Sequence, residues 1–262
     1  MSPLLGIGGI CYALYFVFTT PPGGFKGYYD ESSLVLLLLT PPSIMLLSHT
    51  VSDFFVGTVT LIKSLFRRQK NSQKEVINFL SQASAMIRSQ GMGSLVTVKD
   101  KISYDLLRDG VTMIVNNFTA DEIRHNLMAK INAKQSRMEL AANLFENMAK
   151  VSPGVGMIGT LLGLIDMMAN LSDPSKIGGG MALAMITTLY GLLLGTLLYG
   201  PCSEKISLEK DKSTEIDLMV LEGVISLKSK KSSLHMKDIM NTYGSSSRSS
   251  KGAGNNGKPR SA

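Results

Sequence analysis

Long stretches of this chain carry no charged side chain, and their lengths match the thickness of a bilayer. Residues 1–25, 32–52 and 177–203 contain no Asp, Glu, Lys or Arg, and residues 151–172 contain only Asp166. A hydrocarbon core of about 30 Å is crossed by a helix of about 20 apolar residues. One such stretch could be the buried helix of a soluble protein, but four of them predict a membrane protein. The predicted spans are residues 4–20, 33–53, 152–171 and 178–200.

The first of these stretches could instead be a secretory signal peptide. No Lys or Arg precedes its apolar core, and the Pro21-Pro22-Gly23-Gly24 sequence after it is not a small-x-small cleavage site. We therefore expect the stretch to be retained as a membrane span. The predicted fold class is all-α, a polytopic membrane protein with four transmembrane helices and a helical cytoplasmic insert.

The distribution of Lys and Arg predicts the topology. Segment 63–150 holds fourteen of the 27 basic residues and the tail after Pro201 holds eleven, whereas loops 21–31 and 172–176 hold one each. Basic residues concentrate on the cytoplasmic side of membrane proteins. We expect a multi-pass protein of the bacterial inner membrane with both termini cytoplasmic. The formal net charge of +7 then reflects topology and anionic lipid, and we expect no nucleic-acid partner.

The insert has the pattern of helices. Apolar spacing predicts one amphipathic helix over Lys74–Gln90 and another helix over Asp105–Val115. Thr119, followed by acidic residues, is the predicted N-cap of a third helix. Because no Gly or Pro interrupts residues 119–152, we expect this helix to run through Lys150 into the third span.

Beyond Pro201 the residues are good formers of an exposed helix, and the last twenty residues are mainly Gly, Ser, Asn and basic. Such a composition cannot bury enough apolar surface to become ordered. The predicted domains are 1–62 with membrane helices 1 and 2, the cytoplasmic helical domain 63–150, 151–201 with membrane helices 3 and 4, the helical extension 202–242, and the disordered basic tail 243–262.

No constellation of catalytic or metal-binding residues is present in the sequence. Cys11 and Cys202 are far apart, and His49, His125 and His235 are scattered. Neither a nucleophile elbow nor a zinc-protease or P-loop motif occurs. We therefore expect no enzymatic activity, no bound metal and no cofactor.

Gly154-x-Gly156-x-x-Gly159 fits a dinucleotide-binding fingerprint by its letters alone. The fingerprint requires a preceding strand and a βαβ unit, whereas this one lies in a predicted membrane helix. The glycines are better explained as packing residues. Gly159-x-x-x-Gly163 and Gly191-x-x-x-Gly195 form small-xxx-small faces that let two helices approach closely.

Three threonines lie deep in the last two spans, Thr160 in the third and Thr187-Thr188 in the fourth. At ~1.5 Å per residue, Thr160 lies about 13 Å from the start of its span and Thr188 about 19 Å from Pro201. Both depths are near the middle of the bilayer. A threonine in a helix often only bonds its own i−4 carbonyl. A hydroxyl cluster at this depth can instead replace part of a cation's hydration shell or hold a water wire.

These two spans contain no deep titratable side chain. Asp166 lies near the external end of the third span, where it can snorkel or line a vestibule. A proton path requires a titratable group. If the threonines line such a path, the acid must come from a different polypeptide, and we expect an obligate partner.

The chain resembles flagellar motor stator subunits of the MotA/PomA family, a branch of the MotA/TolQ/ExbB superfamily. The resemblance covers nearly all of the chain before residue 240. The residues that carry the resemblance are Pro153 to Gly163, Ser172-Asp173-Pro174, Ala182 to Gly191, and Pro201 with Glu204 to Leu208, with a weaker match over 108–124.

The resemblance implies a function and a set of partners. Several copies of the subunit, expected to form a pentamer, would surround a dimer of a single-span, peptidoglycan-binding partner of the MotB/PomB type. The partner's transmembrane Asp would accept the transported H⁺ or Na⁺. Ion flow would then drive the cytoplasmic domain, residues 63–150, against a FliG-type rotor switch protein.

The resemblance also implies roles for individual residues. The three threonines match hydroxyls near the ion site, and Pro153 and Pro201 match prolines that act in conformational change. Asp30 matches an external acid implicated in ion access, and Arg88 matches a basic residue that engages the rotor. The acid expected about eight residues after Arg88 is replaced by Val96, so other charges could contact the rotor.

Two alternatives to an ion-driven stator remain open from the sequence. A TolQ/ExbB-type energiser would act on an envelope partner, although those relatives usually have three spans. A membrane scaffold without ion flux would need none of the threonines. The coupled ion also stays open between H⁺ and Na⁺.

Overall fold

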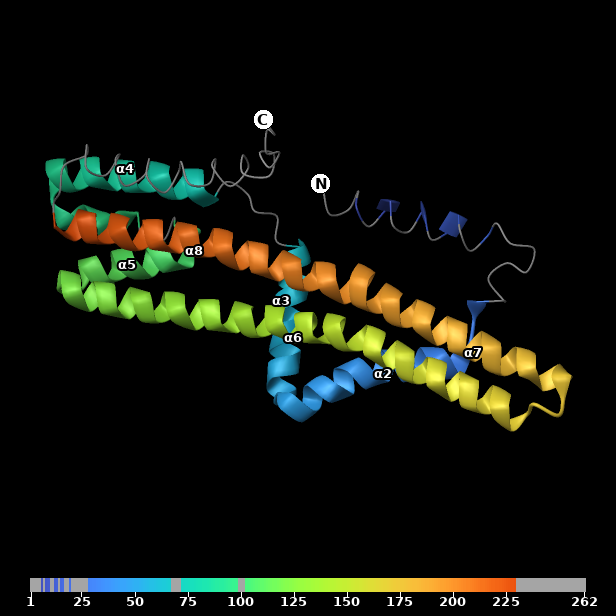
Figure 1. The fold of residues 1–262 in the computed structure, drawn as a ribbon. Coiled ribbons are helices and arrows are strands. Elements are labelled where there is room, and N and C mark those ends of the chain that lie inside the picture. The colour runs from blue at the N-terminus through green and yellow to red at the C-terminus, as the bar shows by residue number, and fades with distance from the viewer. Residues whose placement is uncertain are drawn as a thin grey trace, which may run out of the picture. The chain divides into compact units, whose positions relative to one another are not determined.

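The computed structural model describes residues 28–66, 72–98 and 102–229, with scattered residues between 6 and 19. Within these ranges all regular elements are helices, as predicted (Figure 1). The first predicted span, most of the loop that follows it, and the tail beyond residue 229 lie outside the described residues. The elements are α2 (Glu31–Ser48), α3 (Val51–Phe66), α4 (Ser72–Gln90), η2 (Met92–Thr97), α5 (Asp105–Val115), α6 (Ala120–Ala169), α7 (Pro174–Leu192), the π-helical η4 (Leu193–Tyr199) and α8 (Gly200–Lys228).

The chain divides into two compact units. The first unit comprises Met1–Leu65 and Met138–Ser207, and the second comprises Phe66–Arg137 and Leu208–Ala262. Three helical stretches of the described residues are long and apolar enough to cross a membrane, and they overlap the second, third and fourth predicted spans. These stretches are Glu31–Ser48, Ala120–Ala169 and Ile177–Lys228.

The second predicted span is shorter in the structure than in the sequence-based prediction. Helix α2 ends at Ser48 and α3 begins at Val51. The break is stabilised by a capping box, because the Thr50 hydroxyl donates to the Asp53 carboxylate at 2.7 Å and the Asp53 N–H donates to the Thr50 hydroxyl oxygen at 3.4 Å. The Thr-x-x-Asp pattern is a signal that the sequence analysis passed over.

The other predicted helix boundaries agree closely with the structure. Helix α4 begins two residues earlier than predicted and ends before Gly91, which has a φ of 80°. Helix α5 matches its predicted bounds. The long helix α6 starts after Thr119, whose hydroxyl and N–H both donate to Glu122 at 2.8 Å. It then continues without a break to Ala169.

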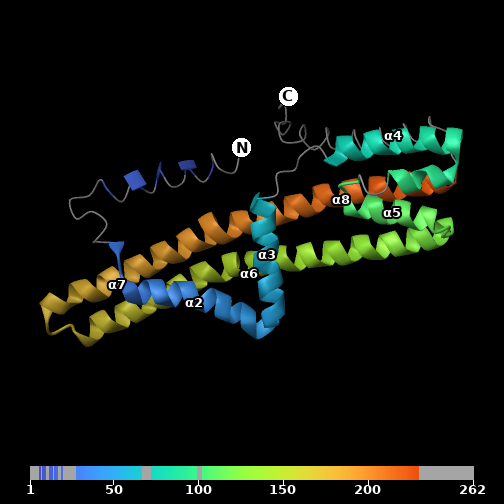
Figure 2. The ribbon, with the colours of Figure 1, turned by 180° about the vertical axis from the view of Figure 1, so that it is seen from behind.

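In the first unit, α6 turns into α7 through residues 170–173, and the two helices run antiparallel (Figures 1 and 2). Asp173 caps α7 by accepting the Ser175 N–H at 3.2 Å, and Pro174 occupies the first turn. Met45 of α2 joins a buried cluster with Leu144 of α6 and Ile206 of α8. Next to this cluster, a hydrogen bond joins α8 to α6, because the Ser203 hydroxyl donates to the Ala142 carbonyl at 2.8 Å.

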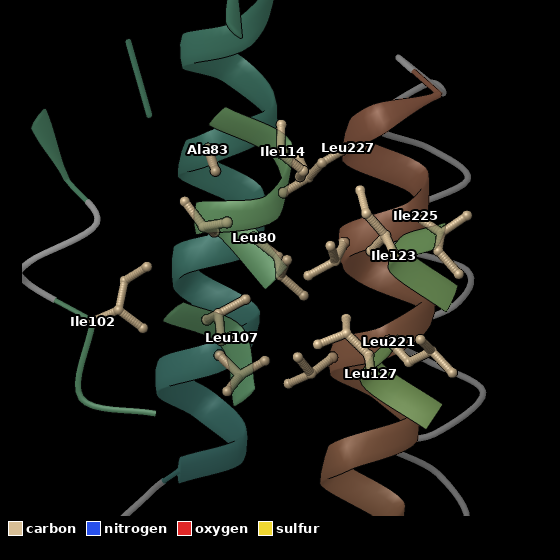
Figure 3. Close-up of a cluster of buried hydrophobic side chains, with 14 of the residues drawn as sticks. Leu80, Ala83, Ile102, Leu107, Ile114, Ile123, Leu127, Leu221, Ile225 and Leu227 are labelled. Carbon is tan, nitrogen blue, oxygen red and sulfur yellow. The ribbon is translucent and has the colours of Figure 1, made fainter. Parts of the chain in front are cut away.

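The second unit has its own apolar core, formed by α4, η2, α5 and the adjoining parts of α6 and α8 (Figure 3). Two glycines bring these helices together. A Cβ on Gly223 of α8 would lie 2.5 Å from Cδ1 of Leu80, and one on Gly110 of α5 would lie 2.8 Å from Cγ2 of Val224. The predicted helical insert therefore folds around the part of α8 that follows residue 207.

Asp217 is the most deeply buried charged residue among the described residues of this second unit. The Asp217 side chain is 2% exposed, and its carboxylate accepts from the Tyr104 hydroxyl at 2.5 Å and from the Lys134 ammonium at 2.7 Å. The Lys134 ammonium also lies 5.7 Å from the centre of the Tyr104 ring. The group links the residues before α5 to α6 and α8.

Candidate functional site

Helices α6 and α7 approach closely because glycines line their contact. A Cβ on Gly159 would lie 2.5 Å from Cβ of Thr187, and one on Gly163 would lie 2.6 Å from the carbonyl oxygen of Gly180. A side chain at either position would therefore push the helices apart. This contact confirms the packing role predicted for Gly159 and Gly163.

The other glycines predicted to pack between α6 and α7 differ in how much space surrounds them. A Cβ on Gly191 would lie 3.0 Å from Cα of Gly156, so these two residues allow the same close approach. A Cβ on Gly154 would meet nothing within 4 Å. Gly154 therefore takes no part in the contact between α6 and α7.

The close approach brings Thr160 and Thr188 together. Their hydroxyl oxygens lie 2.5 Å apart, across the contact between α6 and α7. The Thr160 hydroxyl is also 3.1 Å from its i−4 carbonyl at Gly156, and the Thr188 hydroxyl is 3.1 Å from its own at Ala184. The two threonines thus form one polar site, which we call the threonine pair.

The number of hydrogen atoms in the threonine pair determines what it can bind. Each hydroxyl has one hydrogen and two acceptor lone pairs. One hydroxyl donates to the other and the second donates to a helix carbonyl, which leaves three lone pairs for other donors or for a cation. An oxygen-rich site of this kind suits a hard cation or a proton-carrying water.

The threonine pair lies within an exposed apolar surface of the first unit. On α7, Thr188 follows Met181 and Met185 at helical spacing, and both methionines are exposed. On α6, Met157 and Leu161 flank Thr160 and are exposed to a similar degree. Exposed apolar stripes of a membrane helix face lipid or another protein. The oxygens of the pair therefore face whatever covers this surface.

Thr187 lies apart from the threonine pair although it was predicted to share the same site. Its side chain is fully buried against Gly159. Its hydroxyl lies 2.9 Å from the Leu183 carbonyl and 3.1 Å from the Ala184 carbonyl, both on its own helix. In this structure Thr187 fills the contact between α6 and α7, and its role in an ion path stays a prediction.

The two predicted hinge prolines lie in regular helical stretches with different local geometry. Pro153 is inside α6, where its missing N–H leaves the Ala149 carbonyl without its helical donor. Pro201 follows the π-helical η4, in which the chain makes wider turns. A π-helical turn is a known way for a helix to absorb local strain, and such turns occur often at functional sites.

Asp30 is the N-cap of α2. Its carboxylate accepts from the Ser33 N–H at 2.7 Å and from the Ser33 hydroxyl at 2.5 Å. The Tyr190 hydroxyl of α7 donates to the Tyr28 carbonyl, two residues before this cap. The start of α2 is therefore held beside the part of α7 that contains Thr188. The role of Asp30 in ion access stays a prediction.

Arg88 belongs to the second unit. It lies in the last turn of α4 and is exposed to solvent. Val96, at the position where the resemblance led us to expect an acid, is exposed in η2. The role of Arg88 in contact with the rotor stays a prediction.

No cluster of metal-binding side chains occurs among the described residues. The part of α6 from Ser152 to Ala169 carries one carboxylate, that of Asp166. Its side chain is exposed, and the Asn170 amide donates to its Oδ1 at 3.3 Å. Within the described part of the chain, the threonine pair forms its hydrogen bonds with hydroxyl and carbonyl groups. The expectation of an acid from a partner stays a prediction.

Sequence reasoning missed two features of this region. The contact between Tyr190 and Tyr28 joins residues far apart in the chain, and no local pattern indicates it. The π-helical η4 also went unpredicted. Its available signal was Gly195 and Gly200 shortly before a proline, a combination that favours distortion of a helix.

Comparison with known proteins defines the class. Residues 98–216 match the MotA/TolQ/ExbB proton channel family. The fold resembles the solved structure of C. jejuni MotAB with a TM-score of 0.84 at 16% identity, covering 92% of this chain and 94% of that one. It also resembles the flagellar MotAB stator complex of Bacillus subtilis with a TM-score of 0.83 at 20% identity, covering 95% of this chain and 98% of that one. The chain is a helical membrane protein of this channel class.

Sequence relatives narrow the class further. Motility protein A of Borreliella burgdorferi is 30% identical over 86% of this chain and 85% of the relative. Chemotaxis protein PomA of Vibrio alginolyticus is 28% identical over 87% of this chain and 88% of the relative. The chain belongs to the MotA/PomA family of flagellar motor stator subunits. Members of this family are channel and stator subunits rather than enzymes.

Proposed function

We propose that this chain couples proton or sodium flow across the inner membrane to the torque of a flagellar rotor. The threonine pair is the observation that supports this function best. It places two hydroxyls, with oxygen lone pairs to spare, in the middle of an exposed apolar surface on α6 and α7. Such a site is costly in a helix pair that faces only lipid, and it is useful where an ion must lose part of its water.

The same surface supports an obligate partner. The pair needs a titratable acid to transfer protons, and its own helices provide none at that depth. A single-span, peptidoglycan-binding protein of the MotB/PomB type can cover the apolar stripes with its helix and present an Asp to the pair. The solved structures that share this fold are MotAB complexes, which favours such a partner here.

We further propose a homo-oligomer, expected to be a pentamer, around that partner. Each copy has four spans with both termini in the cytoplasm, since residues 4–20 provide the fourth apolar stretch and the basic residues concentrate in the insert and tail. In this arrangement Asp30 would lie on the route by which ions enter.

Ion passage would be converted to motion through α6 and α8. An ion that moves down a potential of 100 mV releases about 2.3 kcal/mol per charge. Pro153 and Pro201 weaken the two helices between the threonine pair and the second unit, so that a change at the pair can alter the direction of the helical extensions. The second unit, with the exposed Arg88, would then push on a FliG-type rotor protein.

Gene deletion is the first test of this proposal. Cells that lack the chain should assemble normal flagellar filaments that do not rotate, and expression of the wild-type chain should restore swimming. Loss of the filaments would instead indicate a role in assembly, and normal swimming would exclude the stator function unless a second stator is present. A strain with no other stator genes removes that exception.

Swimming speed against external Na⁺ at fixed pH then distinguishes the two ions. A sodium-driven stator gives a speed that saturates with Na⁺, whereas a proton-driven one gives a speed that does not change. Thr196→Val is a matched control for hydroxyl loss, because the Thr196 hydroxyl bonds its own i−4 carbonyl at Leu192. This variant should retain the wild-type ion dependence.

A further inference from the structure

The Tyr190 side chain of α7 has a hydroxyl that bonds outside its own helix. It donates to the backbone carbonyl of Tyr28, just before the start of α2, and Figures 1 and 2 both show this end of α2 beside α7. By contrast, the Thr187 and Thr188 hydroxyls lie within 3.1 Å of carbonyls of α7 itself. Tyr190 therefore adds a directed bond to the packing of α7 against α2.

Tyr190 and Thr188 lie on opposite sides of α7. Two residues correspond to about 200° around a helix. Thr188 faces Thr160 of α6, whereas Tyr190 faces the start of α2. Helix α7 is thus held by polar contacts from two sides, by α6 at the threonine pair and by α2 at Tyr190.

The start of α2 offers Tyr190 an acceptor that is itself held in place. The Asp30 carboxylate caps this helix by accepting the Ser33 N–H at 2.7 Å and the Ser33 hydroxyl at 2.5 Å. Toward its other end, α2 is anchored by Met45, which lies in a buried cluster with residues of α6 and α8. Because both parts of α2 are fixed within the first unit, the Tyr28 carbonyl is a stable reference point for α7.

The threonine pair does not fix the rotation of α7 by itself. Each hydroxyl of the pair also lies 3.1 Å from its own i−4 carbonyl. A rotation of α7 that separates Thr160 from Thr188 would therefore leave neither hydroxyl without a partner. The packing of Thr187 against Gly159 opposes such a rotation without a directed bond between the helices. The bond from Tyr190 supplies a directed contact on the other side of α7.

We propose that Tyr190 is a positioning residue for the threonine pair. Its hydrogen bond to the start of α2 fixes the rotation of α7 and keeps Thr188 directed at Thr160. A site whose oxygens are held in place binds a cation better than one that must first be assembled. This last step rests on the proposed ion-driven function, whereas the geometric role of Tyr190 does not.

Disulfide formation between α6 and α7 tests the geometric role. The full-length chain, with Cys11 and Cys202 replaced by Ala, carries Thr160→Cys and Thr188→Cys in membrane vesicles. The hydroxyl oxygens that sulfur replaces lie 2.5 Å apart, near the S–S bond length of about 2.05 Å, so the pair should cross-link within one chain. Tyr190→Phe keeps the ring and removes the hydroxyl. It should lower the rate of cross-linking about threefold, the usual effect of one hydrogen bond between membrane helices.

Thr196→Val is the matched control, because it removes a hydroxyl that bonds the Leu192 carbonyl of its own helical stretch. The cross-linking rate should not change in this variant. Asp30→Ala loosens the start of α2 and should lower the rate as Tyr190→Phe does. The two changes together should be no worse than either one, since both act on the same contact. An unchanged rate in either single variant, an additive loss in the double variant, or an equal loss in Thr196→Val would overturn the proposal.

Swimming speed separates positioning from a merely structural role. In cells with the native threonines and no other stator genes, speed is measured against external Na⁺ at fixed pH, or against pH if Na⁺ has no effect. Tyr190→Phe should raise the half-saturating concentration of the driving ion about threefold and retain the speed at saturation. A lower saturated speed with an unchanged half-saturating concentration would overturn the positioning role. If deletion of the whole chain leaves rotation normal, the proposed function fails, and cross-linking still decides the geometric role.

Discussion

Gly195 lies directly against the ring of Pro153. A Cβ on Gly195 would come within 3.1 Å of the Pro153 Cδ and within 2.8 Å of the Ala149 carbonyl oxygen. That oxygen is the one for which Pro153 supplies no helical donor. The weakest point of α6 therefore faces the π-helical η4, which contains Gly195 and precedes Pro201. The position at which α6 lacks a backbone donor thus lies beside the π-helical turns of η4.

Substitution of Gly195 should be harmful because no space exists for a side chain. We expect Gly195→Ala to separate the helices locally and to destabilise the protein by about 1–3 kcal/mol, the usual cost of overpacking. The melting temperature of the solubilised complex and the swimming speed of the cells should both decrease. Gly154→Ala is the control, since a Cβ there meets nothing within 4 Å. A Gly195→Ala variant that is as stable as Gly154→Ala would contradict this account of the contact.

The threonine pair predicts that Thr160 and Thr188 act together. Thr160→Val or Thr188→Val alone should reduce swimming strongly, and the double variant should be little worse than either. The effects of the two changes on the free energy of unfolding should be non-additive by about 0.6 kcal/mol and at most about 1.7 kcal/mol, the average and the maximum for hydrogen bonds between membrane helices. A double-mutant cycle on thermal unfolding measures this coupling. Strict additivity would show that the two hydroxyls do not interact.

Thr187→Val should behave differently from these variants. The Thr187 hydroxyl bonds carbonyls of its own helix, and valine has the same branched shape. We expect the variant to fold normally and to show no coupling with Thr160→Val. Coupling as large as that of Thr188 would place Thr187 within the pair and would restore the three-threonine site predicted from the sequence.

The helices could be predicted because each depends on local signals. The apolar stretches, the Thr119 cap and the Gly91 terminus all lie within a few residues of the boundary they determine. The contact between Thr160 and Thr188 was only partly predictable. Depth along each helix placed the hydroxyls at a similar level, but which hydroxyl faces which helix depends on packing. Thr187 and Thr188 differ in this respect although they are adjacent.

Long-range contacts lay beyond the sequence analysis for a physical reason. The Asp217 group combines residues from three segments, and nothing near Tyr104 or Lys134 indicates that a carboxylate from α8 will meet them. The Tyr190 contact with Tyr28 is of the same kind. Pairs such as these are determined by the arrangement of helices, whereas patterns along one chain segment report on a single helix.

The cap of α6 predicts a dependence of stability on acid pH. The pKa of Glu122 is lowered below its ordinary value of 4.5, first by the hydrogen bond from the Thr119 N–H and then by that from the Thr119 hydroxyl. Because the folded state favours the ionised carboxyl, its stabilisation is complete above the unfolded pKa and is lost as the pH falls through the lower folded value. We expect Glu122→Gln to lower the melting temperature at pH 7, and this effect should decrease as the pH falls below 4.5 and through the lower folded pKa.

Asp121→Asn is the control for this pH dependence. It removes an acidic charge from the same first turn of α6 and leaves the contact between Thr119 and Glu122 in place. Its effect on the melting temperature should be smaller at pH 7. If the two variants follow the same pH curve, the general charge at the helix N-terminus, and not the capping hydrogen bonds, stabilises this end.

Two ion pairs of the second unit should contribute very differently to its stability. Lys134 pairs with Asp217 at 2.7 Å, with side chains 36% and 2% exposed. Lys130 pairs with Asp109 at 2.6 Å, with side chains 50% and 37% exposed. Both lysines lie on α6 one turn apart, so their helix propensities and distance from the N-terminus are closely matched.

Lys134→Ala leaves the Asp217 carboxylate buried without its cation, and removal of one partner of a buried pair costs about 3–5 kcal/mol. We expect about 3 kcal/mol, the lower end, because Lys134 is partly solvated and the Tyr104 hydroxyl still donates to the carboxylate. Lys130→Ala should cost at most about 1 kcal/mol, as is usual for exposed pairs. Urea unfolding of both variants measures the difference.

Asp217→Asn should recover much of the lost free energy of unfolding in the Lys134→Ala background, since it removes the unpaired charge and retains an acceptor for Tyr104. No recovery would mean that the lysine stabilises the unit through packing of its alkyl chain over the Tyr104 ring instead.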